Sequence, residues 1–568
     1  MSAATADPFA RDRAEIAASR RRMFRRLGTY VRRNRGDYAM GVLATMAYAG
    51  FFVAFPIAVG WCIRGLEQGV PASEVAMRCA ALAGVALLRS AFRFQSRIRL
   101  FNAAREIEFQ LRNDLFAHLQ RLPQSFYARW RTGDLMSRCV NDLTSVRLML
   151  GPGLLQTAQT PVLMGAAVAT MFFIEPRLAA LVLLPIPLFL LVARAFGRAM
   201  HASNLAVQVG LSDTSSHLQE VVSGMPVVKA YAMEDVTRER FAKLTDDLYE
   251  RHMRVARVQG GLPAVTQLRP MTGMAIIFLV GGGMVTSGRI DLGDFFTFAV
   301  LNFELTLPLF FLGWMFNLVQ RGAASMERID DVLTTEPSIA DRPDVVPVDR
   351  LSGEIEMRGL TFHHPGTEGR EPALRDVDLH VPAGTVLGVV GPVGAGKTTL
   401  ASLIPRLFEV DDGMLFLDGI DVNRIPLGTL RRSIAMVPQD GFLFSMSLAD
   451  NVAYGLPDTD MERVREASER AQLAKDLGEL PHGYDTIVGE RGVMLSGGQR
   501  QRTALARALA LDPQILILDD TLSAVDAETE AAIQEGLREV FRGRTVVVVA
   551  SRVSTVRDAD RIVVLDEG

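Results

Sequence analysis

The sequence predicts an all-α transmembrane domain of six helices with long cytoplasmic helical extensions, followed by an α/β domain of the phosphate-loop type. Three observations support this fold class. Apolar residues are concentrated before roughly residue 320 of the 568-residue chain. Strand-like apolar segments at 385–390, 515–518 and 546–550 then alternate with helical stretches, which indicates a mostly parallel sheet. The glycine-rich string GPVGAGKT (391–398) directly follows the first of these segments.

Residues 1–38 are rich in Arg, which is a cytoplasmic signal ahead of a first membrane span. The apolar residues near the end of this stretch recur at helical spacing among the arginines, and they are Met23, Phe24, Leu27, Tyr30 and Val31. We therefore expect a cytoplasmic tail that ends in an interfacial elbow helix lying on the bilayer.

The transmembrane domain is expected over residues 39–322. Apolar runs with few or no charges predict spans, and these runs are 39–63, 148–174, 178–193, 258–288 and 295–320. A weaker candidate at 75–96 is interrupted by Arg78, Arg89 and Arg93. It is included as the sixth span because the Arg-rich residues 97–147 would otherwise lie on the wrong side of the membrane.

The connections between these spans alternate in length. Residues 97–147 and 194–257 are long, charged and mostly free of Pro, and the Arg excess of the first places both in the cytoplasm. We expect them to form helical extensions that pack on the α/β half. A Pro-rich stretch predicts a linker at 323–352, so that the nucleotide-binding domain occupies 353–568.

The glycine-rich string predicts a site for a nucleoside triphosphate, ATP. Its strand–turn–helix context lets backbone N–H groups converge on phosphate oxygens at a helix N-terminus. Lys397 is expected to reach the β- and γ-phosphates, Thr398 to ligate Mg²⁺, and Asp519 to be the outer partner of that ion. The residues expected to bind ATP here are Gly391, Pro392, Val393, Gly394, Ala395, Gly396, Lys397, Thr398 and Thr399.

Residues 495–499 read LSGGQ and precede a helix rich in Ala and Arg. Taken alone, a Ser-Gly-Gly sequence is an ordinary helix N-cap, but this one lies between the phosphate loop and Asp519. In this order of motifs the chain resembles the ATP-binding cassette (ABC) family over nearly its whole length. The stretches TGDLM (132–136) and 314–317, with Arg321-Gly322, make it most similar to multidrug-resistance-like half-transporters of the exporter class.

The resemblance implies roles for further residues. Gln439 would form the Q-loop that senses Mg²⁺ and the attacking water, so that the magnesium site would comprise Thr398, Gln439 and Asp519. Ser523 and Asp526 would belong to the D-loop, and 486–492 would touch the transmembrane extensions. The signature would serve the phosphate loop of a second chain, and its residues are Leu495, Ser496, Gly497, Gly498 and Gln499.

Three positions depart from the family's pattern. The family's general base is a Glu, and Asp520 stands in its place with a carboxylate withdrawn by roughly 1.5 Å. The family's γ-phosphate His is replaced by Ser551, and its adenine-stacking aromatic residue by His364. Because two of the three catalytic positions, Asp520, Gln439 and Ser551, are altered, we expect a site that binds ATP and hydrolyses it poorly.

This asymmetry predicts a heterodimer, in which the chain lends its complete signature to a partner half-transporter that carries the intact Glu and His. The alternative is a homodimer that tolerates Asp520.

Charged residues inside the spans are candidates for a substrate cavity, because charges in a bilayer tend to face the bundle interior or water. The candidates are Arg89, Arg93, Arg269 and Glu304, with the aromatic neighbours Phe303, Phe310 and Phe311. The alternative for Arg89 and Arg93 is that they snorkel or form structural ion pairs.

Together these features predict ATP-driven export of a hydrophobic or amphipathic small molecule, drug- or lipid-like, across a bacterial plasma membrane. The N-terminus and the ATPase domain would be cytoplasmic, and family members normally continue beyond the position of Gly568. A siderophore-type importer on the same scaffold remains an alternative. We expect no nucleic-acid partner. A soluble ATPase of this family that handles nucleic acid is excluded if the six predicted spans insert into a membrane.

Overall fold

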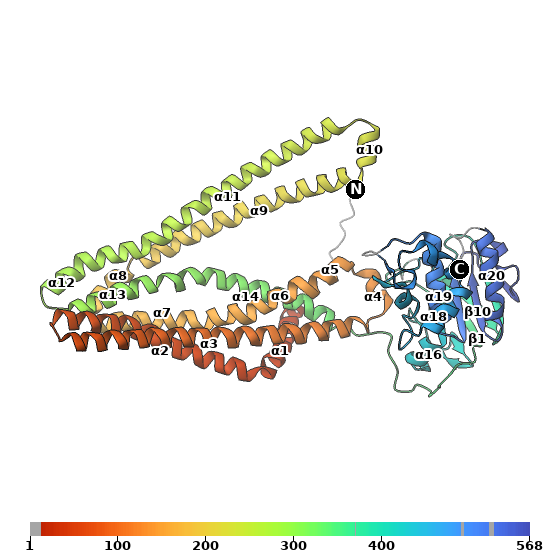
Figure 1. The fold of residues 1–568 in the computed structure, drawn as a ribbon, viewed down its shortest axis with the longest axis horizontal. Coiled ribbons are helices and arrows are strands. Elements are labelled where there is room, and N and C mark those ends of the chain that lie inside the picture. The colour runs from red at the N-terminus through yellow and green to blue at the C-terminus, as the bar shows by residue number, and fades with distance from the viewer. Residues whose placement is uncertain (1–12, 368, 370, 490–492, 522–526) are drawn as a thin grey trace. The chain divides into compact units, whose positions relative to one another are not determined.

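The computed structural model describes residues 13–367, 369, 371–489, 493–521 and 527–568 (Figure 1). The chain divides into two compact units. The first comprises Met1–Phe116 and Met136–Leu333, and the second comprises Ala117–Leu135 and Thr334–Gly568.

The first unit is helical, as predicted. Its α-helices are α1 (Arg13–Arg33), α2 (Arg35–Glu67), α3 (Ala72–Leu119), α6 (Leu143–Leu148), α7 (Leu154–Ile174), α8 (Pro176–Leu183), α9 (Ile186–Ser223), α10 (Met225–Ala230), α11 (Glu234–Ile276), α12 (Gly282–Thr286), α13 (Leu292–Glu304) and α14 (Thr306–Leu333). The short helix α4 (Gln124–Arg129) belongs to the second unit, and α5 (Thr132–Ser137) crosses the boundary between the units along the chain. Three π-helical turns, η1 (Arg138–Asp142), η2 (Met149–Gly153) and η3 (Ile277–Gly281), continue helices without a break.

Among the described residues, five helical stretches are long and apolar enough to cross a membrane. They are Arg35–Glu67, Ala72–Leu119, Thr132–Ile174, Pro176–Ser223 and Gln267–Thr286. These stretches agree with five of the six predicted spans, including the weak candidate at 75–96. The sixth, 295–320, covers α13 and the start of α14, where several side chains lie outside the described residues, and it stays a prediction.

The predicted extensions are helical and continue the membrane helices. At 48 residues, α3 is about 70 Å long, more than twice the hydrocarbon thickness of a bilayer. In the second extension α9 and α11 lie side by side and are joined through α10 (Figure 1). Residues 117–135 of the first extension group with the α/β part of the chain, where His118 Nε2 lies 2.9 Å from the carbonyl oxygen of Thr335.

The apolar residues of α1 do not all share one environment. Met23, Leu27 and Tyr30 are buried, whereas Phe24 is exposed. The Tyr30 hydroxyl donates a 2.6 Å hydrogen bond to Asp114 of α3, and Arg26 forms a 3.0 Å ion pair with the buried Asp330 of α14. One face of α1 therefore packs on the protein, and its predicted position at the membrane interface stays a prediction.

The sixth predicted span is interrupted between Glu304 and Thr306. Pro308 lacks the N–H that would bond to the Glu304 carbonyl, so the helical ladder is broken at this point. Arg269 of α11 donates to the carbonyl oxygen of Asn302 and, at 2.9 Å, to Thr306 Oγ1. The side chain of Asn302 in turn donates to the Pro270 carbonyl at 2.9 Å. Side chains thus satisfy polar backbone groups beside the break, as burial in a membrane domain requires.

The second unit contains a five-stranded sheet in the order β11-β3-β10-β9-β6 and a four-stranded antiparallel sheet in the order β2-β1-β4-β5. All neighbours in the five-stranded sheet are parallel. The strands are β1 (Ile355–Phe362), β2 (Leu374–Val381), β3 (Val386–Val390), β4 (Leu415–Leu417), β5 (Ile420–Asp421), β6 (Ile434–Val437), β9 (Ile515–Asp519), β10 (Thr545–Val549) and β11 (Arg561–Val564), with the short pair β7 (Met446–Ser447) and β8 (Ile487–Val488) apart.

The helices of this unit are α15 (Lys397–Leu403), α16 (Leu427–Ser433), α17 (Leu448–Val452), α18 (Met461–Arg470), α19 (Gly497–Ala510) and α20 (Ala527–Phe541). Short 3₁₀ turns are η4 (Val422–Arg424), η5 (Leu473–Glu479), η6 (Gly483–Asp485) and η7 (Val553–Val556). The three predicted strands are confirmed as β3, β9 and β10. Their residues alternate between two hydrophobic cores, so that Leu516 and Leu518 face one core while Ile515 and Ile517 face the other. Burial on both faces explains why these strands are continuous apolar runs.

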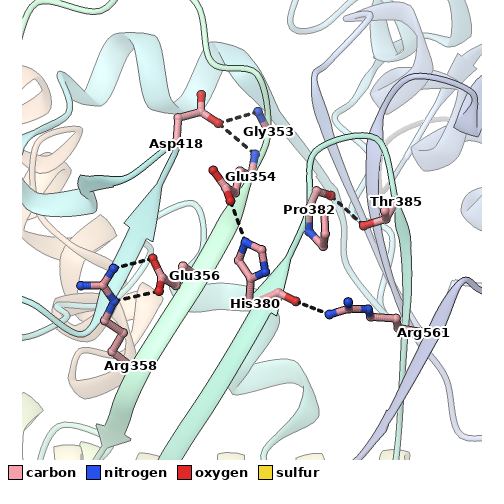
Figure 2. A network of polar contacts seen from close by, with 9 residues as sticks. All are labelled: Gly353, Glu354, Glu356, Arg358, His380, Pro382, Thr385, Asp418 and Arg561. Carbon is pink, nitrogen blue, oxygen red and sulfur yellow. Dashed lines mark hydrogen bonds and ion pairs between the residues drawn. The ribbon is translucent and has the colours of Figure 1, made fainter.

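A polar network joins the two main sheets (Figure 2). Asp418 accepts hydrogen bonds from the backbone N–H groups of Gly353 and Glu354, which fixes the approach to β1. The Glu354 carboxylate lies 2.6 Å from His380 Nε2, on β2. Arg561, at the start of β11, donates to the His380 carbonyl at 2.9 Å and so ties the parallel sheet to the antiparallel one.

Candidate functional site

The residues of the α/β unit that are predicted to be functional converge because they follow parallel strands. Val549 of β10 is paired with Val389 of β3 on one side and with Asp519 of β9 on the other. Val437 of β6 is paired with Leu518 of β9. The loops after these four strands therefore leave the sheet at one edge, where ligands of parallel α/β sheets bind.

The loop after β3 requires glycine at two close approaches. Gly391 has φ 157°, and a Cβ there would lie 2.2 Å from the Leu565 carbonyl oxygen. Gly396 has φ 92° at the N-cap of α15, and a Cβ there would lie 2.3 Å from the Ala373 carbonyl oxygen. Lys397 Nζ donates to the carbonyl oxygens of Gly391 and Pro392 at 2.8 and 2.9 Å. The ammonium group thus lies over the loop that is predicted to hold phosphates.

Thr398 and Asp519, two of the predicted magnesium ligands, lie together. Thr398 Oγ1 donates a 3.0 Å hydrogen bond to Asp519 Oδ1, and Asp519 is 1% exposed. Burial, supported by the neighbouring Asp520, raises the pKa of Asp519 above its usual range, although the bond from Thr398 and the charge of Lys397 act in the opposite direction. No group of three or more His, Cys, Asp or Glu residues suited to a metal occurs in the described part of the chain. Mg²⁺ needs fewer, since it takes one or two protein oxygens together with substrate phosphates.

Substitution of Asp519 by Asn is expected to weaken the Mg²⁺-dependent binding of ATP by roughly 10- to 100-fold. A carboxyl group must be ionised to ligate Mg²⁺, and its pKa is raised here. In the wild type we therefore expect the Mg²⁺ affinity to begin falling at a higher pH than an ordinary Asp would give. A titration of nucleotide binding with Mg²⁺ at several pH values measures both effects.

The same variant should not lose stability without nucleotide. A raised folded-state pKa makes an ionised Asp519 unfavourable, so the folded protein loses stability as pH rises above the unfolded-state pKa. Asp519→Asn removes this cost, and its nucleotide-free melting temperature near neutral pH should equal or exceed that of the wild type. The exposed Asp458→Asn is the matched control, and equal effects of both variants on Mg²⁺ binding would contradict the assignment.

Asp520 and Ser551, the two altered catalytic positions, contact each other. Asp520 has φ 47°, and its backbone N–H donates to the Val549 carbonyl at 2.8 Å. Asp520 Oδ1 accepts a 3.0 Å hydrogen bond from Ser551 Oγ and a 3.3 Å bond from the Ser551 backbone N–H. The carboxylate is thus held at the end of β10. Gln439, the third predicted catalytic residue, is exposed just beyond β6.

His364, the predicted adenine contact, lies beside the phosphate-loop helix. Its Nε2 is 3.1 Å from Thr399 Oγ1. Its ring meets the rings of Phe362 and Phe408 edge-on, with centroid separations of 5.1 and 5.5 Å. The imidazole therefore has a fixed place close to α15.

The LSGGQ residues form the N-terminus of α19. The side chain of Ser496 caps the helix and forms a reciprocal capping box with Gln499. Gln499 Nε2 also donates to Glu479 at 2.9 Å, and Arg502 forms two bonds of 2.7 and 2.8 Å to the buried Asp476. Leu495 is buried, whereas Ser496 and Gly497 are exposed. The LSGGQ residues therefore act as an ordinary helix N-cap and also present a surface that another chain can reach.

Two residues that sequence reasoning missed support this site. Arg507 of α19 donates to the carbonyl oxygens of Asn451 and Phe442 at 2.8 and 3.0 Å and to Asn451 Oδ1 at 2.9 Å. Asn451, fully buried, also donates to the Phe444 carbonyl at 2.9 Å. They fasten the segment after Gln439 to the signature helix. Arg507 looks in sequence like any Arg of an Ala/Arg helix, so no sequence signal distinguished it.

In the helical unit the four charged candidates are not equivalent. Glu304 Oε1 accepts a 2.6 Å bond from Arg89, and Arg269 is bound at the break described above. Arg93 is exposed. The D-loop residues Ser523 and Asp526, residues 490–492 of the 486–492 loop, and the side chains of Phe310 and Phe311 lie outside the described residues.

Comparison with known proteins agrees with this arrangement. Residues 38–309 match the family model described as the ABC transporter transmembrane region, and residues 374–523 match the family model described as ABC transporter. The chain is 36% identical over 552 residues to the multidrug resistance-like ATP-binding protein of Escherichia coli, covering 96% of this chain and 92% of that protein.

The chain belongs to the ABC transporter family. It is thus a multi-pass membrane protein that binds ATP and couples its hydrolysis to transport. It is also 35% identical over 503 residues to the fatty acid ABC transporter ATP-binding/permease protein of Mycobacterium bovis, covering 88% of this transporter and 79% of that protein. The ATP-dependent lipid A-core flippase of Syntrophus aciditrophicus is 35% identical over 475 residues, or 84% and 78% of the two chains.

Proposed function

We propose that this transporter is one half of a heterodimeric exporter whose own nucleotide site binds MgATP but hydrolyses it slowly. The observation that carries this proposal is the pairing of Asp520 with Ser551. A general base must lie within about 2.6–3.2 Å of the proton that it removes. The Asp520 carboxylate is one methylene shorter than Glu and is engaged by the hydroxyl and backbone of Ser551. Both features keep it from an attacking water.

The residues expected to bind magnesium and phosphate, in contrast, are all present. Lys397, Thr398 and Asp519 are present and adjacent, which supports tight binding of MgATP with Thr398, Asp519 and Gln439 around the ion. His364 supports the adenine, and Ser523 and Asp526 complete the D-loop. The site then acts as a clamp that holds nucleotide.

The signature supports the choice of a heterodimer. Ser496 and Gly497 are exposed at the start of α19, where they can serve the phosphate loop of another chain. A chain that kept a complete signature beside a weak catalytic centre is useful to a partner that hydrolyses ATP. A homodimer would contain two weak sites and no strong one.

Exposed apolar residues on α9, α10 and α11 also support a second subunit. In the charged segment 194–257 large apolar side chains are exposed, and they include Leu205, Val209, Leu218, Val222, Val227, Tyr231, Val236 and Tyr249. So many exposed apolar side chains in a segment outside the bilayer indicate an interaction surface. We propose that the partner half-transporter covers it.

The relatives support export of a hydrophobic or amphipathic compound. The names of the three describe multidrug resistance, fatty acid transport and lipid A-core flipping. We propose a drug- or lipid-like substrate, a plasma-membrane location with the N-terminus and ATPase part in the cytoplasm, and the domain boundaries 1–38, 39–322, 323–352 and 353–568.

The ATPase rate of the purified chain tests the weak site. We expect a rate far below the order of ten per second that is usual for enzymes, and Asp520→Asn should leave it unchanged within about twofold. Lys397→Ala should abolish ATP binding and serves as the control for a functional pocket. Rapid hydrolysis that Asp520→Asn abolishes would instead establish the homodimer.

A further inference from the structure

The charges in the predicted spans do not balance. Within the described residues, Arg78, Arg89 and Arg93 of α3 and Arg269 of α11 lie in spans, and Glu304 of α13 is the acidic residue inside them. Arg78 pairs at 2.6 Å with Glu74, which lies just before its span. Because unpaired charge in a bilayer is costly, each of these groups needs a partner or a role.

Arg89 is fully compensated. Its NH1 donates to Glu304 Oε1 at 2.6 Å, in an ion pair that is largely buried on both sides. Its guanidinium carbon also lies 5.1 Å from the ring centroids of both Phe52 and Phe55, which provides two cation–π contacts. Arg89 thus engages Glu304 Oε1, and Glu304 Oε2 is buried, so the carboxylate presents no accessible oxygen to a cationic substrate.

Arg269 has a structural task. Its side chain is 7% exposed and its NH1 donates to Asn302 and Thr306 at the break in the sixth predicted span. A guanidinium buried against backbone in this way does not offer an accessible surface to a transported molecule.

Arg93 differs from both. It lies one turn beyond Arg89 on α3 and is exposed, and in the described part of the chain it makes no hydrogen bond or ion pair. Glu304 already pairs with Arg89, and one carboxylate cannot neutralise two guanidiniums. Net positive charge is therefore left at Arg93.

Apolar surface lies next to this charge. Leu87 and Phe94 are seven residues apart and so occupy one face of α3, with 71% and 65% exposure. Ile98, one turn beyond Phe94, continues the stripe at 38% exposure. Arg93 directly precedes Phe94 and so lies about 100° round the helix from this stripe. Its long side chain has the reach to place a cationic group at the edge of the apolar surface.

We propose that the transported compound is an anionic amphiphile, whose acid group pairs with Arg93 and whose apolar part lies along Leu87, Phe94 and Ile98. This inference rests on the proposed export function and deepens it by assigning the charge of the substrate. A guanidinium binds a carboxylate or phosphate by charge-assisted hydrogen bonds, which a neutral or cationic head group cannot accept. Because Glu304 is paired with Arg89, the surface around Arg93 does not also attract cations.

Three amphiphiles with the same twelve-carbon tail test the proposal, namely dodecyl phosphate, dodecyl maltoside and dodecyltrimethylammonium. Each is added below its micellar concentration to membrane vesicles that contain the full transporter, and ATP-dependent uptake is measured. We expect preference for dodecyl phosphate in the wild type. Arg93→Gln should raise its half-saturating concentration by about 10-fold with little effect on the other two. Arg93→Glu should shift the preference to the cation.

Two further variants sharpen the result. Arg105→Gln removes another exposed cation of α3, beyond the predicted span, and should change nothing. Glu304→Gln should leave dodecyl phosphate uptake intact or increase it, whereas a cation site at Glu304 would lose uptake of dodecyltrimethylammonium. Uptake without preference for the anion, or an anion preference that survives Arg93→Gln, overturns this inference alone. Absence of ATP-dependent uptake for all three probes overturns the export function as well.

Discussion

Replacing Asp520 by Glu and Ser551 by His together is expected to raise the ATPase rate of the purified transporter by about 100-fold or more. The longer side chain moves the carboxylate outward by roughly 1.5 Å. Removal of the Ser551 hydroxyl, 3.0 Å from Asp520 Oδ1, removes the shorter of the two bonds by which Ser551 holds the carboxylate at β10. The double variant should therefore exceed Asp520→Glu alone. Phosphate release from the chain reconstituted in lipid measures the rate.

This gain depends on the signature, because two copies of the double variant would each supply LSGGQ to a complete site. Adding Lys397→Ala to the double variant is the control and should abolish the activity, since Lys397 lies on the phosphate loop. The degenerate-site proposal fails if the wild type already hydrolyses ATP rapidly or if the double variant, shown to dimerise, is no faster.

Substitution of Arg507 by Met is expected to destabilise the nucleotide-binding unit by about 2–3 kcal/mol. The change removes three hydrogen bonds to Asn451 and Phe442 while keeping most of the side-chain volume. It also removes cation–π contacts of 5.8 and 5.6 Å with the stacked rings of Phe444 and Tyr454. For a unit of this size the loss corresponds to a melting temperature lower by about 5–10 °C.

Arg500→Met, on the exposed face of the same helix, is the matched control and should leave the melting temperature within about 1–2 °C of the wild type. Thermal unfolding of the two variants in the same detergent provides the comparison. Equal melting temperatures for Arg507→Met and the wild type would show that other contacts hold the segment after Gln439 in place.

Much of the fold could be predicted because its signals are local. Five spans and the helical extensions follow from the length of the apolar stretches and the placement of charges. Strands β3, β9 and β10 follow from continuous apolar runs, because both faces of each strand are buried in a hydrophobic core. The phosphate loop was recognisable because Gly391 and Gly396 must adopt backbone conformations with no room for a side chain. The interruption after Glu304 was harder to predict, since a proline inside a span can be accommodated in several ways.

The pairings between distant residues could not be predicted. Arg89 and Glu304 are separated by 215 positions, and Arg507 and Asn451 by 56, so no spacing rule connects them. Sequence reasoning placed Glu304 in the candidate cavity, and it had no means of showing that Arg89 engages the carboxylate.

The sequence by itself determined the class of transporter, because phosphate binding, bilayer crossing and strand burial are each specified by short stretches of residue types. It also exposed Asp520 and Ser551 as departures from a pattern. Only the tertiary structure decided which charges and carboxylates are already engaged, since a 3 Å contact depends on how separate helices and strands pack. That packing joins Asp520 to Ser551 and Glu304 to Arg89, and it leaves Arg93 exposed.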